Sequence, residues 1–203
     1  MQPYPVPAEA VNFSEEIKKS RFITLLAHTE GVEAAKTFIQ DVRNQHPVAR
    51  HHCWAFVAGA PADSQQLGFS DDGEPAGTAG KPILGQLMGS GVGELTAVVV
   101  RYYGGIMLGT GGLVKAYGGG VQQALKLLTV HQKVPLVEYK LHCDYPQLAL
   151  VEGLMQQIGG QILQSDYGAA VELRLALPAA EAAAIVIRLY DLSRGTLQLQ
   201  PAS

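Results

Sequence analysis

The chain has 203 residues, of which 47% are hydrophobic and 16% charged, and its formal net charge is −3 at pH 7. This composition is typical of a globular protein with a buried core and excludes a disordered chain. No apolar run approaches the roughly 20 residues of a membrane-spanning helix, and the first residues do not resemble a signal peptide. Two cysteines far apart in sequence, Cys53 and Cys143, favour a reduced, cytoplasmic protein with no membrane partner.

The charges are distributed differently in the two parts of the chain. Residues 1–134 carry 11 Lys/Arg and 11 Asp/Glu, whereas residues 135–203 carry 4 and 7. Neither part has the strongly basic footprint of proteins that bind nucleic acid through charge alone. The sequence therefore allows a local basic patch but not a basic domain.

In chain order, the first part predicts a mixture of strands and helices. A loose proline-rich arm of seven residues comes first, and the next two strands form a hairpin near Lys18–Ser20. The apolar periodicity predicts strands at 11–17, 21–27, 52–57 and 95–102, helices at 33–43, 79–88 and 113–128, and a polar loop over 61–75.

Two features of these elements bear on packing. The unbroken apolar run Leu95–Val100 predicts a central strand that is covered on both faces. Three consecutive glycines, Gly118–Gly120, lie inside the last predicted helix and cost about 1 kcal/mol each relative to alanine. They either permit tight packing of the helix on the sheet or mark a break in the helix.

The second part predicts a strand at 136–143, a helix at 146–158, strands at 161–167 and 171–177, a helix at 178–190 and a strand at 196–200. This β-α-β-β-α-β order is the ferredoxin-like arrangement. Val134–Pro135 marks the expected boundary. The sequence therefore predicts an α/β (α+β) protein with two domains, residues 1–134 and 135–203.

Glycine is concentrated in one region, because 16 of the 23 glycines lie between Gly68 and Gly120. Glycine loses more backbone entropy on folding than any other residue, so it is expected where the chain needs positive φ or a close backbone approach. A strand between glycine-rich loops can present exposed backbone amides, which suit anions. The functional surface is expected in this region.

The segment GKPILGQLMGSGVGELTAVVVRYYGGIMLG, from Gly80 to Gly109, resembles the signature of the IMPACT family. The signature consists of a glycine, spaced aliphatic residues, Arg-aromatic-aromatic-Gly-Gly and a further Leu-Gly. The flanking blocks HHCWAF, FSDDGEPAGTAG and GGLVKAY are similar to the same family, and the C-terminal part of the chain is similar to the second domain of its bacterial members. The signature positions are Gly80, Ile83, Leu84, Leu87, Val92, Val98, Val99, Arg101, Tyr102, Tyr103, Gly104, Gly105, Leu108 and Gly109.

The resemblance implies a first domain similar to the second domain of ribosomal protein S5. It implies a ferredoxin-like second domain similar to the last domain of elongation factor G. Eukaryotic relatives restrain the starvation-response kinase that acts on translation initiation, by competing for its activator protein. We therefore expect a non-catalytic, translation-linked binding protein that contacts RNA, the ribosome or a translation-associated protein and needs no cofactor.

Two other functions stay open. The S5-like fold also occurs in small-molecule kinases, so the chain could be an enzyme acting on a small phosphorylated substrate. It could also be a protein-interaction module that acts through the acidic C-terminal domain.

Gly77–Lys81 invites interpretation as a phosphate-binding loop, but Pro75 and Pro82 occupy positions where a Walker A loop needs glycine and Ser/Thr. A different anion site remains, in which amides of Gly77–Lys81 and Gly104–Gly112 are joined by basic side chains and an aromatic stacking face. The expected anion- or nucleic-acid-binding residues are Lys81, Arg101, Tyr102, Tyr103, Gly104, Gly105 and Lys115.

The loop before this region contains a tight acidic cluster, Asp71, Asp72 and Glu74. Three carboxylates can hold a hard cation such as magnesium, but more often such residues cap the following helix or face solvent. We expect no metal, and Arg101 either grips a phosphate or pairs with an acid of this loop. The surface loop is expected to consist of Asp71, Asp72, Glu74, Gly77, Thr78 and Gly80.

His51, His52 and Cys53 suggest either a zinc site or a nucleophile with a base. A structural zinc site needs four ligands, and no second paired cluster is near in sequence. We therefore expect Cys53 to pack in the core with one histidine hydrogen-bonded, and we assign no catalytic residue.

Overall fold

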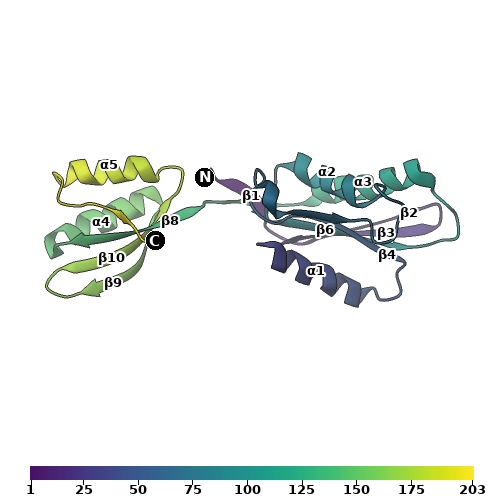
Figure 1. Cartoon of the computed structure of the whole chain (residues 1–203), viewed down its shortest axis with the longest axis horizontal. Coiled ribbons are helices and arrows are strands. Elements are labelled where there is room, and N and C mark those ends of the chain that lie inside the picture. Colours follow the sequence, from purple (N-terminus) through teal and green to yellow (C-terminus); the bar gives the residue numbers. More distant parts are fainter. The chain divides into compact units, whose positions relative to one another are not determined.

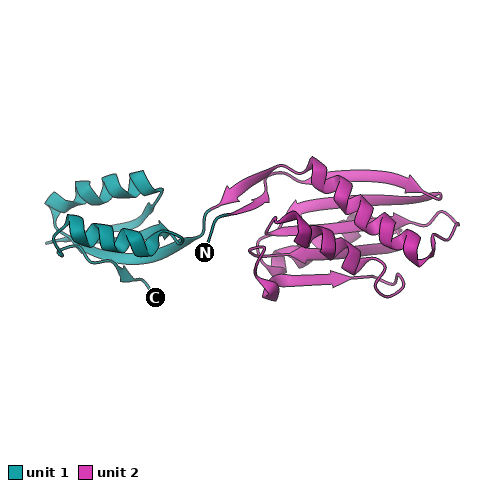
Figure 2. Cartoon of the chain, turned by 90° about the horizontal axis from the view of Figure 1, so that it is seen from above, with its two compact units in different colours: residues 1–3, 134–203 teal, residues 4–133 magenta.

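The structure is a computed structural model that describes residues 1–203. The chain divides into two compact units (Figure 2). Residues 4–133 form the first unit, and residues 134–203 together with residues 1–3 form the second.

The first unit is built on a five-stranded antiparallel sheet in the order β2-β3-β6-β4-β5. Helix α1 covers one face of this sheet, and helices α2 and α3 cover the other (Figure 1). The strands are β2 (Val11–Ile17), β3 (Ser20–His28), β4 (His51–Val57), β5 (Leu67–Ser70) and β6 (Leu95–Tyr102), and the helices are α1 (Val32–Gln45), α2 (Gly80–Ser90) and α3 (Gly109–Leu127).

Strand β6 lies at the centre of the sheet and is buried from Leu95 to Arg101. Alternate residues of a strand face opposite sides. Accordingly, Leu95, Ala97 and Val99 pack in the core beneath α2 and α3, and Val98 and Val100 pack beneath α1. The prediction of a central strand covered on both faces is confirmed.

Helix α3 is continuous through Gly118–Gly120, so these glycines do not break it. A Cβ atom added at Gly120 would lie 2.8 Å from the Thr24 hydroxyl on β3, while one at Gly119 would meet nothing within 4 Å. Glycine at position 120 therefore permits close packing of α3 on the sheet, as the first of the two interpretations predicted. The helix also begins at Gly109, four residues earlier than the sequence predicted.

Two expected irregular segments contain strands. The N-terminal arm includes β1 (Tyr4–Pro7), which pairs with β7 (Val130–Lys133) in a separate two-stranded sheet. The polar loop over 61–75 includes a short 3₁₀ turn, η1 (Ser64–Gln66), and the edge strand β5. The expectations of a loose arm and of a wholly irregular loop are therefore wrong. Both segments are short, and prolines or polar residues interrupt their apolar pattern. Each is ordered by pairing with another strand, β1 with β7 and β5 with β4.

The second unit has a four-stranded antiparallel sheet in the order β11-β8-β10-β9, with both helices on one face (Figure 1). Its elements are β8 (Leu136–Cys143), α4 (Tyr145–Ile158), β9 (Gln161–Tyr167), β10 (Val171–Pro178), α5 (Ala182–Leu192) and β11 (Gln200–Pro201). This is the β-α-β-β-α-β order that the sequence predicted. Helix α5 begins later than predicted because Pro178 still pairs with Leu136 in the sheet.

None of the helices combines the length and the apolar character that crossing a membrane requires.

Candidate binding pocket

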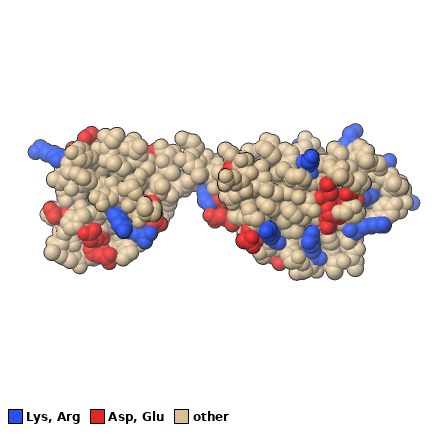
Figure 3. All heavy atoms as spheres, in the orientation of Figure 1, with Lys and Arg blue, Asp and Glu red and all other residues tan.

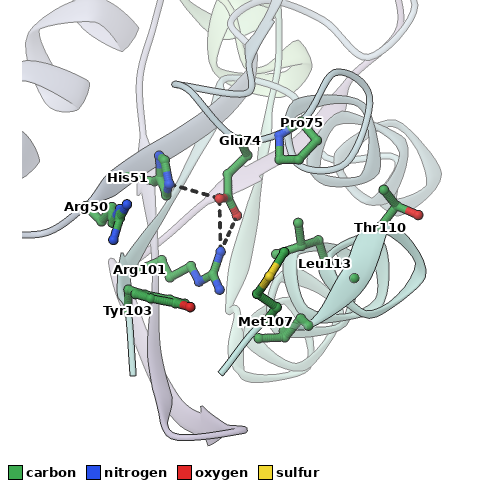
Figure 4. A pocket seen from close by; sticks show the side chains of 11 residues that line it. Arg50, His51, Glu74, Pro75, Arg101, Tyr103, Met107, Thr110 and Leu113 are labelled. Atoms are coloured by element: carbon green, nitrogen blue, oxygen red, sulfur yellow. Dashed lines mark hydrogen bonds and ion pairs between the residues drawn. The ribbon is translucent and has the colours of Figure 1, made fainter. Parts of the chain in front are cut away.

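A pocket of about 390 Å³ lies in the first unit, where the start of β4 and the end of β6 meet the N-terminus of α3 (Figure 4). The register of the sheet brings these strand ends together, because His51 on β4 stands opposite Arg101 on β6. The loop before α2 forms a further wall. The pocket is lined by Arg50, His51, Glu74, Pro75, Arg101, Tyr103, Met107, Leu108, Gly109, Thr110 and Leu113.

Arg101 and Glu74 form a buried ion pair in the wall of this pocket, and they are 5% and 8% exposed. Arg101 Nη1 donates to Glu74 Oε1 at 2.9 Å and to Oε2 at 2.8 Å. The buried Nε of Arg101 has no hydrogen-bond partner. The alternative in which this arginine pairs with an acid of the Asp71–Glu74 loop is therefore confirmed.

His51 also lies beside Glu74. Its Nδ1 lies 2.7 Å from the Asp72 backbone carbonyl, and its Nε2 lies 2.9 Å from Glu74 Oε1. A carbonyl oxygen only accepts, so Nδ1 carries a hydrogen. Arg101 and Glu74 offset each other in charge, and the cluster of His51, Glu74 and Arg101 gains one positive charge when His51 is protonated.

Tyr103 lines the pocket beside two guanidinium groups. Arg50 Cζ is 5.0 Å and Arg101 Cζ 5.3 Å from the centroid of its ring, and the tyrosine is 39% exposed. These distances fit cation–π contacts, which hold the ring in place while part of it stays open to solvent.

Tyr102 faces the other side of the sheet, as the alternation of side chains along β6 requires. Its hydroxyl lies 2.6 Å from His46 Nδ1, and it packs with the core beneath α1. The structure therefore separates the two tyrosines that the sequence placed in one candidate site, and only Tyr103 lines the pocket.

The carboxylate of Asp71 binds the backbone amides of the predicted Gly77–Lys81 anion loop. It accepts hydrogen bonds from Gly77 N at 3.0 Å, Ala79 N at 3.1 Å and Gly80 N at 2.8 Å. Burial opposes ionisation of this group, but the three amide donors outweigh burial and hold the pKa of Asp71 below its ordinary value. The amides at the start of α2 are thus bound by the protein itself.

The other acids of the loop also have protein partners. Asp72 Oδ2 accepts from His52 N at 2.7 Å, and Asp72 Oδ1 lies 3.5 Å from Arg43 Nη2. Glu74 is held by Arg101 and His51. The acids therefore point to separate partners, and no group of three or more His, Cys, Asp or Glu side chains is arranged to hold a metal ion.

The remaining predicted residues have varied positions. Lys81 on α2 and Lys115 on α3 are exposed, and neither lines the pocket. A Cβ atom at Gly104 would lie 1.9 Å from the Lys19 carbonyl oxygen, so this glycine lets the chain pass close to the β2–β3 hairpin. Gly105 has φ +87° beside the pocket, a conformation that favours glycine, and Thr78 Oγ1 donates to the Pro75 carbonyl at 2.6 Å.

Arg50 is exposed and lines the pocket, although its sequence context did not indicate a site residue. It immediately precedes β4, and only the pairing of β4 with β6 shows that it lies near Arg101. Cys53 is fully buried, its Sγ donates to the Asp71 carbonyl at 3.0 Å, and burial raises the pKa of its thiol. A buried thiol of this kind is unreactive, which agrees with a packing role.

The fold and the pocket define a two-domain α/β protein whose first unit carries the candidate site. Residues 18–125 match the family profile described as the Impact N-terminal domain, and residues 141–196 match a domain of unknown function, DUF1949. The chain belongs to the IMPACT family, as its signature residues predicted.

Several relatives align over nearly the whole chain. The chain is 68% identical over 199 residues to the IMPACT family member YigZ of Escherichia coli K12, covering 98% of both chains. It is 57% identical over 200 residues to an IMPACT family member of Haemophilus influenzae, covering 98% of this chain and 97% of the relative. A crystal structure of a hypothetical protein is 67% identical, with a TM-score of 0.75, and the match covers 100% of this chain and 98% of that one.

Proposed function

We propose that this chain is a non-catalytic, cytoplasmic binding protein linked to translation, which contacts RNA, the ribosome or a translation-associated protein. The observation that carries the proposal is the partly exposed ring of Tyr103, which contacts Arg50 and Arg101 in the lining of a pocket. Aromatic and arginine side chains are the usual platform for unstacked bases of single-stranded RNA. We also propose that the first domain is similar to the second domain of ribosomal protein S5, and the second domain to the last domain of elongation factor G.

The charge distribution supports contact through a local site. Residues 1–134 contain equal numbers of basic and acidic side chains. On the visible face, Lys and Arg are scattered among acidic side chains and do not gather into one broad basic patch (Figure 3). If Arg50 and Arg101 make the phosphate contacts, the slope of log affinity against log salt is roughly −1 to −2.

Co-sedimentation with ribosomes, with and without nuclease and at two salt concentrations, tests the proposal. We expect salt-sensitive association that is weakened by Arg50→Ala and by Tyr103→Ala. Lys36→Ala removes a cation that is 62% exposed on α1 and serves as a matched control. Lys81→Ala and Lys115→Ala test the other predicted cations.

The nuclease arm distinguishes the kinds of partner. Association that nuclease abolishes indicates RNA, whereas association that survives nuclease indicates a protein partner, including one that binds the acidic second unit. No association of the wild-type chain under any of these conditions would contradict the proposal.

One observation favours the enzyme alternative. His51 Nε2 lies 2.9 Å from Glu74 Oε1 beside Arg101 in the pocket wall, and an imidazole or a carboxyl group can exchange a proton with a bound substrate. Thermal-shift screening against nucleotides and phosphorylated metabolites, followed by a turnover assay, tests this alternative. Product formation that His51→Asn abolishes would favour an enzyme acting on a small phosphorylated substrate.

A further inference from the structure

The N-terminus of α3 opens into the pocket, where Gly109 and Thr110 line the wall. No side chain caps this helix, and its first turn contains no acidic residue. The first amides of a helix have no partner within the helix, and the aligned peptide dipoles place about half a positive charge at that end. The oxygen atoms of a phosphate satisfy the amides and the dipole together.

Arg101 is a second feature that favours an anion, and it is independent of the helix. It lines the same pocket, is 5% exposed, and makes both hydrogen bonds to Glu74 through Nη1 alone. Its buried Nε has no acceptor, which is unfavourable in a protein interior. The other terminal nitrogen, Nη2, makes no hydrogen bond to the protein, so the guanidinium keeps a donor for a ligand, and it faces Thr110 and Leu113 across the pocket (Figure 4).

The net charge of the pocket selects among phosphates. Arg101 and Glu74 offset each other, Arg50 contributes +1, the start of α3 adds about one half, and His51 adds a further +1 when it is protonated. A phosphomonoester carries about −1.5 to −2 near pH 7. A diester inside a nucleic-acid strand carries only one negative charge. The pocket therefore matches a terminal phosphate better than an internal one.

The rest of the pocket suits an aromatic ring and an apolar surface. The ring of Tyr103 offers a stacking face, and Met107, Leu113 and Pro75 provide apolar walls. The volume of about 390 Å³ falls in the range of small-molecule sites. A nucleotide carries both a phosphate for the start of α3 and a planar base for the ring of Tyr103.

We propose that this pocket binds a single nucleotide through its terminal phosphomonoester, with the phosphate at the N-terminus of α3 and the base against Tyr103. The proposal rests on the RNA contact proposed above. The shared chemistry is that of a nucleoside monophosphate, which is present both as the phosphorylated end of an RNA strand and as a free nucleotide.

Equilibrium binding to matched oligonucleotides tests the proposal. Short single-stranded oligoribonucleotides carry a phosphate or a hydroxyl at the 5′ end in one pair and at the 3′ end in another, and binding is followed by fluorescence anisotropy. One phosphorylated form is expected to bind about tenfold or more tightly than its hydroxyl partner, which is the gain from charge-assisted hydrogen bonds. AMP or UMP is expected to compete, and the corresponding nucleosides are not.

Thr110→Asp tests the position of the phosphate. A carboxylate in the first turn of α3 is favourable for the helix and repels a phosphate at the same place. We expect this variant to unfold at no lower temperature than the wild type and to lose the preference for the phosphorylated end. Thr37→Asp makes the same change at an exposed position of α1 and should keep the preference.

The outcomes separate this proposal from the proposed function. Equal affinity for phosphorylated and hydroxyl ends, with no competition by AMP or UMP, overturns the pocket assignment even if ribosome association stands. Competition by inorganic phosphate as effective as that by AMP or UMP overturns the placement of the base against Tyr103. Binding of free nucleotides without association with RNA or ribosomes supports the pocket assignment and identifies the free nucleotide as the source, while the proposed function fails.

Discussion

Replacing Arg101 with alanine is expected to destabilise the first unit strongly, because it leaves the Glu74 carboxylate buried with one partner fewer. The two residues are 5% and 8% exposed, and their side chains lie 2.8 Å apart at their closest. Breaking a buried pair by removing one partner typically costs about 3–5 kcal/mol. His51 still contacts Glu74 at 2.9 Å, so we expect a value near the lower end, about 3 kcal/mol.

Urea unfolding, followed by the fluorescence of the single tryptophan, Trp54, measures this loss within the first unit. With a denaturant slope of roughly 2 kcal/mol per molar, the unfolding midpoint of Arg101→Ala should fall by about 1.5 M. A shift below about 0.5 M, equivalent to about 1 kcal/mol at the same slope, would refute the reasoning.

A double-mutant cycle separates the ion pair from simple loss of packing. The apolar pair Arg101→Met with Glu74→Leu should be more stable than Arg101→Met alone, because no uncompensated charge then remains buried. Strict additivity of the two single changes would contradict a coupled pair. Because changes at Arg101 are expected to destabilise the fold, they are poor probes of ligand binding. The exposed side chain of Arg50 is a better probe.

Two further predictions concern stability. Gly119→Ala should stabilise the first unit by up to about 1 kcal/mol, because the added methyl group meets nothing within 4 Å. Gly120→Ala should destabilise the same unit by about 1–3 kcal/mol, because the added methyl group overpacks against Thr24. The midpoints of urea unfolding measure both changes. Burial opposes ionisation of Glu94, but hydrogen bonds from Lys133 and other donors hold its pKa below the usual 4.5. Its contribution to stability should therefore be present above about pH 4.5 and be lost as the pH falls further, and Glu94→Gln should remove that part of the pH dependence of the urea midpoint.

The sequence predicted most of the elements because their apolar periodicity is strong. The Leu95–Tyr102 strand has the predicted limits, since a strand buried on both faces has a continuous apolar run. The edge strands β1 and β5 were missed because they have four residues each and are ordered by partners elsewhere in the chain. Tyr4, for example, pairs with Lys133.

The candidate site was harder to predict from the sequence, because the identity of two of its residues depends on three-dimensional contacts. Tyr102 and Tyr103 are adjacent, and only the position of β6 in the sheet decides which of them faces the pocket. Arg50 belongs to the pocket through the pairing of β4 with β6, which no local pattern shows. The roles of Lys81 and Lys115 stay predictions that their alanine variants test.

The two glycine-rich loops show why glycine density alone does not identify an anion site. Both lead into a helix whose first amides could bind a negatively charged group. At α2, the Asp71 carboxylate already accepts from three of the amides of Gly77–Gly80. At α3, no side chain caps the helix and no acid lies in its first turn, while Arg101 and Thr110 face the same pocket. An external anion would have to displace a protein carboxylate at α2 but not at α3, so the free energy of binding favours the start of α3.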